Sequence, residues 1–205
     1  MSVSLTANGA AVRALLSRGE SRAELASLRA VLGPAAGRVL AHDPDAGYLA
    51  ADCSAHYGLK TALRSLLALP GLVLFFDLLA ADEVSWSVDR FASRPLWRSR
   101  ETNELRLLHA AGDRDAEALT GFDLAGVRSG VDCALFHTES QLAASALSFD
   151  CAGEGRLRFL LAGLAPGSWD VWRNGWLEHG QVRVPAPACT LRFEGRPGGY
   201  FLRKL

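Results

Sequence analysis

The 205-residue chain has little lysine, no net charge and no long uninterrupted apolar run, and each absence excludes a class of function. Its 22 basic and 22 acidic residues balance, and lysine occurs only at Lys60 and Lys204. A chain without excess positive charge has no electrostatic attraction to nucleic acid or acidic membranes. The longest apolar stretch, "LLALPGLVLFFDLLAA", is interrupted by Pro70-Gly71 and by Asp77. We therefore predict no nucleic-acid partner and no membrane span.

Motifs for common metal and nucleotide chemistry are also missing. No two of the four cysteines have CxxC spacing, which argues against a zinc knuckle or a thioredoxin-type site. An even number of cysteines allows two disulfides, but buried free thiols are the simpler interpretation. The sequence contains no GxSxG, HExxH, P-loop or dinucleotide-binding fingerprint. It therefore offers no ready assignment to a hydrolase, zinc protease or nucleotide-binding class.

The N-terminal part is expected to be helical. Ser21 and Glu24 have capping-box spacing, apolar residues then repeat at helical intervals, and Gly33-Pro34 ends the pattern. A shorter helix is possible over residues 10–16. The first 19 residues lack the basic segment and long apolar run of a secretory signal. We assign residues 1–34 to a helical segment.

Short β-rich runs separated by turn residues fill the rest of the chain. Pro70-Gly71 joins two of them, and Asn174-Gly175, a strong hairpin signal, joins two others. The apolar run 72–79 lacks alternation, as in a strand covered on both faces. The fold class is thus mostly β: a large antiparallel β-sandwich over 35–205, with a loop near 112–130. Strands are predicted over residues 38–42, 47–57, 62–69, 72–79, 83–91, 104–110, 131–138, 143–150, 156–163, 169–173, 181–184, 189–195 and 200–205.

The segment "YLAADCSAHYG", residues 48–58, resembles a crowded active site. If it is a strand, Asp52, Ser54 and His56 share a face, with neighbours about 6.6 Å apart. A Ser-His-Asp triad needs the histidine between the other two groups, whereas here Ser54 lies in the middle. Asp52 and His56 would be about 13 Å apart, too far to share a metal ion. A helix would bring them together, but Gly47 and Gly58 make a helix doubtful. We expect Asp52 to cap a turn, unless distant residues complete a metal site.

Other candidates are isolated in the sequence. His42, His109, His137 and His179 have no neighbouring metal ligands, so each is interpreted as a surface or hydrogen-bonded histidine. "GRPGG", residues 195–199, is Gly-rich but opens no helix, so we interpret it as the turn before the last strand.

Three tryptophans lie in the hairpin predicted around Asn174-Gly175. In that register Arg173 pairs with Trp176, and Trp172 lies on the opposite face. At least one indole should then point away from the core, where it could stack on a sugar or pack on another domain. Burial of these rings under neighbouring strands is the alternative. The segment "DRFASRPLWRSR" is expected to be a basic loop, either solvated or offering guanidinium groups to an acidic glycan from Arg90, Arg94 and Arg98. Arg64 is a further candidate for such a contact.

The stretch from residue 47 to 88 resembles the C-terminal β-domain of heparinase II/III-like polysaccharide lyases. That domain has an Asp-x-Ser/Thr-x-x-Tyr element, an Arg-led strand, an apolar strand ending in Asp and a Trp-containing strand. The tail, "FLLAGLAPGSWDVWRNG" with "GGYFLRKL", is a looser match. The matching positions of the first stretch are Asp52, Ser54, Tyr57, Arg64, Asp77 and Trp86.

The resemblance implies a β-sandwich that borders a cleft shared with an α/α toroid. In the family the toroid supplies the catalytic Tyr and His, and the start of the β-domain adds another His. Only 51 residues precede Asp52 here, and neither that upstream His nor the one following the Trp strand is recognised. We therefore assign no catalytic residue. Some family members hold a structural zinc, but its His ligands are not identified here, so we predict no cofactor or metal.

The leading hypothesis is a β-sandwich module of a heparinase II/III-like polysaccharide lyase, inactive in β-elimination on its own. It would pack on an α/α-toroid catalytic domain or contact an acidic polysaccharide. The alternatives are a stand-alone carbohydrate-binding sandwich and a structural, oligomerising domain. The family implies the periplasm or cell surface, whereas a natural start without a signal peptide would imply the cytoplasm.

Overall fold

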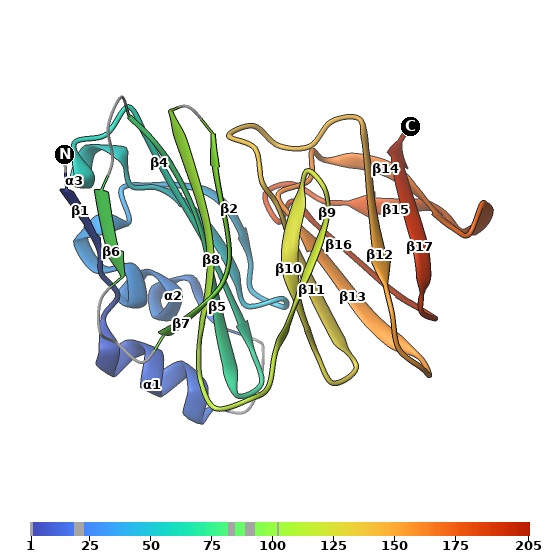
Figure 1. Ribbon diagram of the computed structural model, residues 1–205, viewed down its shortest axis with the longest axis horizontal. Helices are drawn as coiled ribbons and strands as arrows, with labels where there is room; N and C mark the ends of the chain where they lie inside the picture. Colours follow the sequence, from blue (N-terminus) through green and yellow to red (C-terminus); the bar gives the residue numbers. More distant parts are fainter. Residues whose placement is uncertain (1, 19–22, 82–84, 89–92, 102) are drawn as a thin grey trace. The chain divides into compact units, whose positions relative to one another are not determined.

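A computed structural model describes residues 2–18, 23–81, 85–88, 93–101 and 103–205. The fold is mostly β with a small helical part near the N-terminus, which confirms the predicted fold class. The chain divides into two compact units, unit 1 (Met1–Arg114) and unit 2 (Asp115–Leu205) (Figure 1). The boundary falls inside the segment 112–130 that was expected to separate two strand groups. The assignment of residues 35–205 to one sandwich stays a prediction.

Unit 1 is built on a six-stranded antiparallel sheet. The two-residue connection Pro70-Gly71 joins the strands β4 (Thr61–Leu69) and β5 (Leu72–Ala80) into a hairpin. Gly71 takes the left-handed φ of 70° that the turn requires. Leu69 therefore pairs with Leu72, and every later pair of the hairpin follows from this register. The strands lie in the order β2 (Arg38–Asp43), β3 (Tyr48–Asp52), β4 (Thr61–Leu69), β5 (Leu72–Ala80), β8 (Glu104–Ala111) and β7 (Ser93–Glu101).

Two helices cover one face of this sheet (Figure 1). Helix α1 (Gly9–Ser17) begins at Asn8, whose side chain accepts hydrogen bonds from the first backbone N–H groups of the helix. Helix α2 (Leu25–Leu32) ends at Gly33, as predicted, while Ser21 of the expected capping box lies outside the described residues. A parallel pair, β1 (Ser2–Leu5) and β6 (Ser85–Val88), packs against the same core.

Strand β5 is buried along nearly its whole length. Every residue from Leu72 to Leu79 is buried, as expected for a strand covered on both faces. Val73, Phe75 and Leu79 belong to the core that the helices share, and Asp77 has the same parity along the strand. The one charged residue of β5 therefore lies on the helix-covered face and must find its partners inside the unit.

Unit 2 is a nine-stranded sheet with a core of its own. Its order is β15 (Trp176–Val184), β14 (Gly167–Arg173), β17 (Gly198–Lys204), β12 (Ala146–Cys151), β9 (Glu117–Phe122), β10 (Leu124–Ser129), β11 (Asp132–His137), β13 (Leu157–Ala162) and β16 (Thr190–Gly195). The sheet curls until its two edge strands meet, since His179 Nε2 of β15 lies 2.9 Å from the Glu194 carbonyl of β16. Stacked aromatic rings fill the interior: Phe149, Phe159, Phe193 and Tyr200.

Several elements differ from the sequence-based expectations. Strands β9 and β10 occupy most of the segment 112–130, which was predicted to be a loop. The basic segment that was also expected to be a loop contains β7. Two pairings, β1 with β6 and β11 with β13, are parallel in a sheet system that was expected to be antiparallel. Strands β9 and β10 are rich in small and polar residues, so their partners determine their conformation more than their own propensity does.

The helices are too short and too mixed in character for a membrane. Within the described ranges, none has the length and apolarity needed to cross a bilayer.

Candidate functional site

The segment 48–58 is not one strand. Strand β3 ends at Asp52, and Ser54–Tyr57 forms a single helical turn, α3, that ends at Gly58 with a left-handed φ of 63°. The expectation that the flanking glycines disfavour a helix was therefore wrong, because Gly58 is the residue that terminates it. The predicted interpretation of Asp52 holds: its Oδ1 accepts a hydrogen bond of 3.0 Å from the N–H of Ser54. His56 is exposed.

Hydrogen bonds also explain the electrostatics of this turn. The hydroxyl and then the backbone N–H of Ser54 lower the pKa of Asp52, and the charge of Arg38 adds a smaller effect. Burial raises the pKa of the Cys53 thiol to about 11, so this cysteine is a poor nucleophile at neutral pH. The crowded segment is thus a capped turn held by the side chain of Asp52.

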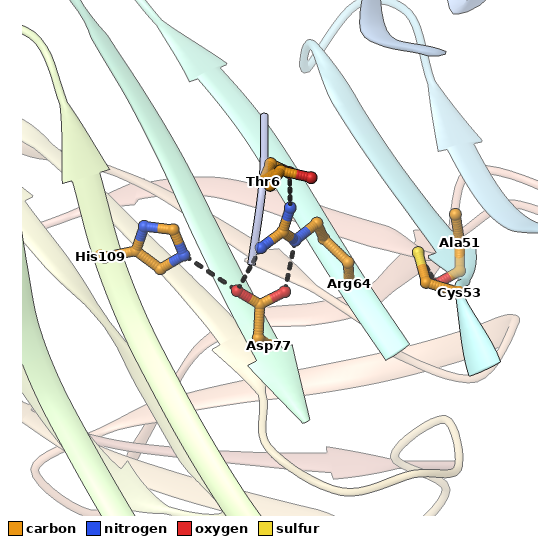
Figure 2. A network of polar contacts seen from close by, with 6 residues as sticks. All are labelled: Thr6, Ala51, Cys53, Arg64, Asp77 and His109. Atoms are coloured by element: carbon orange, nitrogen blue, oxygen red, sulfur yellow. Dashed lines mark hydrogen bonds and ion pairs between the residues drawn. The ribbon is translucent and has the colours of Figure 1, made fainter. Parts of the chain in front are cut away.

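A buried charged network lies in the interior of unit 1, as Figure 2 shows. Arg64 of β4 faces Asp77 of β5 directly across the hairpin. Its Nε and Nη2 donate to the two carboxylate oxygens at 2.5 and 3.0 Å, a bidentate pair, and Nη1 donates to the Thr6 carbonyl at 2.6 Å. His109 of β8 lies with Nε2 2.9 Å from Asp77 Oδ2. We call Arg64, Asp77 and His109 the charged network.

The histidine is held by stacking as well as by this hydrogen bond. Its ring stacks on Phe75 with centroids 4.9 Å apart, and the Arg64 guanidinium lies 5.6 Å from the same Phe75 ring. A carboxylate only accepts hydrogen bonds, so Nε2 carries the proton that it shares with Asp77. Nδ1 is buried and has no hydrogen-bond partner among the described residues.

The charge balance of the network favours an ionised Asp77. Burial alone would raise the pKa of this carboxyl, but the Arg64 charge and hydrogen bonds from His109 and Arg64 outweigh burial and lower the pKa to about 2. Asp77 in turn raises the pKa of Arg64 despite the opposing effect of burial. Both side chains are 1% exposed. The Arg64–Asp77 pair is therefore ionised and desolvated, and both carboxylate oxygens of Asp77 accept hydrogen bonds within the network.

Acid should remove the contribution of this carboxylate to stability. The folded-state pKa of Asp77 is depressed, so its stabilisation is complete above the unfolded-state pKa of about 4 and is lost as the pH falls towards 2. We expect a loss of about 2 kcal/mol in unfolding free energy over that range. Urea titrations at pH 5, 4, 3 and 2 would measure it. In Asp77→Asn this part of the pH dependence should be absent, and an unchanged profile would contradict the assignment.

Two of the remaining motif positions, Tyr57 and Trp86, pack against the core of unit 1. Tyr57 is partly buried against the core of unit 1, and burial raises the pKa of its hydroxyl. Trp86 of β6 is also partly buried in that core and pairs with Val3 of β1. Of the predicted positions, Arg64 and Asp77 are in direct contact, while Asp52 and Ser54 form a separate capped turn.

The described residues provide no metal centre. Within those ranges, no group of three or more His, Cys, Asp or Glu side chains is close enough to hold an ion. The charged network contributes one carboxylate and one imidazole, and a guanidinium already occupies both carboxylate oxygens. It acts as a clamp that joins β4, β5, β8 and the segment after β1.

The outer face of unit 2 carries a row of large apolar side chains. Phe122 of β9 pairs with Ser148 of β12, which pairs with Phe201 of β17. Phe201 pairs in turn with Trp172 of β14, and Trp172 pairs with Leu177 of β15. Directly paired residues share a face of a sheet, and their neighbours in sequence point into the core. We call the four large side chains of this line, Phe122, Phe201, Trp172 and Leu177, the aromatic row; Ser148 lies between the two phenylalanines.

Much of the aromatic row is exposed to solvent. Phe122, Leu177 and Phe201 are 65%, 51% and 43% exposed, and Trp172 is half-buried between the last two. Trp176 is 81% exposed but pairs with Arg173, which places it on the other face at the tip of the hairpin. The prediction that at least one indole lies away from the core is confirmed, whereas Trp169 is fully buried.

The hairpin tip borders a polar pocket of about 770 Å³ in unit 2. Arg173 donates to Glu178 at 3.0 Å, and Arg156 forms an ion pair of 2.7 Å with Glu194. Arg196 of the predicted Gly-rich turn also lines it. The acids offset the arginines, so this pocket has no net positive charge of the kind that would concentrate an acidic polymer.

The segment that carries these features is similar to a known type of domain. Residues 119–204 match the family model of the heparinase II C-terminal domain. The match extends from β9 to β17 and includes the whole aromatic row. It confirms the resemblance to the C-terminal domain of heparinase II/III-like lyases. Among curated proteins, none matches the chain.

The match to the heparinase II C-terminal domain lies on the looser of the two stretches that carried the resemblance. The stretch 47–88, with the more detailed motif, falls outside the matched residues. The family roles suggested for its six motif positions therefore stay predictions. In such a lyase, a C-terminal domain of this type implies a catalytic partner domain.

The arginines suggested as glycan contacts lie in unit 1, outside the matched residues. Arg94 and Arg98 lie on strand β7. Arg94 is half-buried and donates from Nη2 to the Arg114 carbonyl at 2.6 Å. Arg98 is exposed, and Arg90 lies outside the described residues. A cooperative basic surface formed by these three arginines stays a prediction.

Sequence reasoning missed the partner of His109, and it missed Phe122 and Phe201. His109 was interpreted as a surface or hydrogen-bonded histidine, and the hydrogen bond is confirmed. Its partner Asp77 was missed, because the contact depends on β5 pairing with β8, 32 residues along the chain. Phe201 meets Trp172 only because β17 lies beside β14. Arg64 and Asp77, by contrast, follow from the turn: if Leu69 faces Leu72, residue 64 faces residue 77.

Proposed function

We propose that this chain is the β-module of a heparinase II/III-like polysaccharide lyase, and that it contacts the glycan through the aromatic row of unit 2. The match to the heparinase II C-terminal domain supports the module. The exposed row carries the proposal of glycan contact, because it crosses five neighbouring strands of the matched segment in one register. The elimination reaction would belong to an α/α-toroid partner domain.

An aromatic row of this kind suits a sugar chain. The C–H groups of a pyranose ring pack on flat aromatic faces, and an indole adds a large rigid surface. Adjacent strands are about 4.8 Å apart, so the five strands place their side chains along a line of about 19 Å. More than one sugar ring can contact such a line at the same time.

One cation is positioned for an acidic sugar. Arg203 is exposed on β17, two residues from Phe201 and therefore on the same face of the sheet. A guanidinium binds a carboxylate or sulfate group with two parallel hydrogen bonds. Stacking on Trp172 and Phe201 with a charged contact at Arg203 would favour uronate-containing polymers over neutral ones.

We expect no lyase turnover from the described residues. The charged network is buried and its groups bind one another, so an extended polymer has no access to it. Tyr57 has a raised pKa, which makes its hydroxyl a weaker acid. Heparin, alginate and hyaluronan should each be incubated with the protein while the ultraviolet absorbance of the unsaturated uronate is followed. A steady rise in absorbance would overturn the noncatalytic assignment.

Truncating the aromatic row should weaken glycan binding. Trp172→Ala and Phe201→Ala each remove a stacking surface worth about 1 kcal/mol, so we expect each to raise the Kd for an acidic polysaccharide roughly fivefold. Isothermal calorimetry with size-defined heparin, alginate and hyaluronan oligosaccharides would measure the change. Arg203→Gln should weaken binding and reduce its dependence on salt.

Two further variants distinguish the row from other surfaces. Val131→Ser alters an exposed apolar residue outside the row and should leave the Kd unchanged. Trp176→Ala tests the tip of the hairpin on the other face. If Trp176→Ala abolishes binding while Trp172→Ala does not, the glycan contacts the hairpin tip and the row assignment fails. Absence of binding to any glycan would remove the proposal altogether.

A second function is suggested by the same exposed apolar surface. The row would serve a structural, oligomerising module if a second copy of the chain covered it. Sedimentation velocity would then show a dimer that Phe201→Asp converts into a monomer. A monomer at all concentrations, combined with glycan binding, would favour the lyase module instead.

A further inference from the structure

Two cysteines meet inside unit 2. Cys133 of β11 and Cys151 of β12 are 18 residues apart in the sequence, and their sulfurs lie 3.7 Å from each other. Both side chains are buried in the core of the unit. Two strands, β9 and β10, separate β12 from β11 in the sheet, so this contact joins strands that are not hydrogen-bonded neighbours.

The surroundings favour reaction at Cys151. It is the last residue of β12, and the residues that follow it, 152–156, are all exposed. Arg128 of β10 donates from Nη1 to the Ala152 carbonyl of this segment at 2.6 Å, while its Nε donates to the Gly130 carbonyl of the β10–β11 turn at 3.3 Å. Opening of the strand end would bring Cys151 to solvent before Cys133.

We propose that Cys133 and Cys151 are a redox-active pair that forms an intramolecular disulfide within unit 2. A disulfide requires the two sulfurs to approach from 3.7 Å to about 2.0 Å. Since they are already in van der Waals contact, side-chain rotations with little backbone movement would be sufficient. The disulfide would fasten β12 to β11 across the interior.

The electrostatics support an order for the reaction. The contact with Cys133 lowers the pKa of Cys151; burial opposes this shift and the charge of Arg128 reinforces it. The same contact, followed by burial, raises the pKa of Cys133. A thiol with a lowered pKa forms the attacking thiolate more readily, and Cys151 also lies at a strand end followed by exposed residues. Cys151 is then the nucleophile and Cys133 the resolving thiol.

The chemistry needs a disulfide donor, such as oxidised glutathione or a dithiol–disulfide oxidoreductase. The Cys151 thiolate attacks one sulfur of the donor, forms a mixed disulfide and releases one donor thiolate, which takes up a proton. Cys133 then loses its proton and attacks the Cys151 sulfur, releasing the second donor thiol. The two protein thiols lose two electrons together, and the donor disulfide gains them.

The other two cysteines provide internal controls. Cys53 is buried in unit 1, and its thiol lies 3.9 Å from the Ala51 carbonyl (Figure 2). Cys189 is buried in unit 2, and burial raises the pKa of its thiol. Each of these two thiols should remain reduced under conditions that oxidise the proposed pair.

Thiol counting tests the proposal directly. The full chain is equilibrated with oxidised glutathione, unfolded in guanidinium, and titrated with a thiol reagent. We expect two free thiols, against four after reduction, and peptide mapping should link Cys133 to Cys151. Cys53→Ser with Cys189→Ser should leave none, whereas Cys133→Ser or Cys151→Ser should leave three thiols or a mixed disulfide with glutathione.

Thermal unfolding gives a second readout. A crosslink across 18 residues should raise the melting temperature of unit 2 by about 10 °C, and reductant should reverse the rise. If a serine variant fails to fold, peptide mapping of the chain without substitutions still shows which cysteines are linked. Four free thiols after equilibration, or linkages distributed over several cysteine pairs, would overturn the proposal.

Discussion

Asp77→Ala is expected to lower the free energy of unfolding by about 3–5 kcal/mol. The substitution leaves the Arg64 guanidinium 1% exposed without its carboxylate, and it removes the partner of His109 Nε2. An uncompensated buried charge costs far more than the net contribution of the pair it belonged to. Urea denaturation followed by circular dichroism would measure the loss.

The matched control is an ion pair on the surface. Arg156 and Glu194 lie 2.7 Å apart, but their side chains are 76% and 51% exposed. Arg156→Ala should therefore cost less than about 1 kcal/mol. The double variant Arg64→Met with Asp77→Leu removes both charges and should recover most of the stability lost by Asp77→Ala. If Asp77→Ala costs no more than Arg156→Ala, the network does not act as a clamp.

Trp169→Ala is expected to cost about 3–5 kcal/mol in unit 2. Trp169 is fully buried in the core of the unit, and its indole N–H donates to the Ala165 carbonyl at 3.1 Å. Truncation leaves a large cavity and an acceptor without its donor. The substitution removes one of the tryptophans that report on unfolding by fluorescence. Unfolding in guanidinium should therefore be followed by circular dichroism.

Trp176→Ala provides the control in the same hairpin. The ring is 81% exposed, so its removal should change the unfolding free energy by no more than about 0.5 kcal/mol. The pair of variants separates a tryptophan of the core from one available for contact with a ligand. Equal destabilisation by both would show that the hairpin tip is packed in solution.

Local signals predicted the parts of the fold that depend on neighbouring residues. The turns at Pro70-Gly71 and Asn174-Gly175 fix their hairpins through backbone conformations that glycine and asparagine accept. Helix α2 follows from its apolar spacing and from Gly33. Strands β9 and β10, "EALTGF" and "LAGVRS", have weak strand propensity, and their pairing with each other and with β11 and β12 gives them their structure.

The candidate sites likewise divide into contacts that one turn determines and contacts that depend on the order of strands in a sheet. The contact between Arg64 and Asp77 depends on one turn and could be deduced by counting along the hairpin. The contact with His109 depends on the order of strands in the sheet, which no neighbouring residue encodes. The aromatic row requires four strand pairings at once. Sequence analysis could therefore find Trp172 as a candidate but not the phenylalanines beside it.

The continuity of the two units has a consequence for protein synthesis. Each unit is one uninterrupted stretch of chain, so the residues of unit 1 leave the ribosome before those of unit 2. Arg64 and Asp77 are only 13 residues apart and meet within a hairpin, before His109 emerges. The buried charges of Arg64 and Asp77, which are costly to leave unpaired, can therefore pair early in translation. A nascent chain from which all of unit 1 has emerged should already resist proteolysis in that unit, while the strands that carry the aromatic row are still to be made.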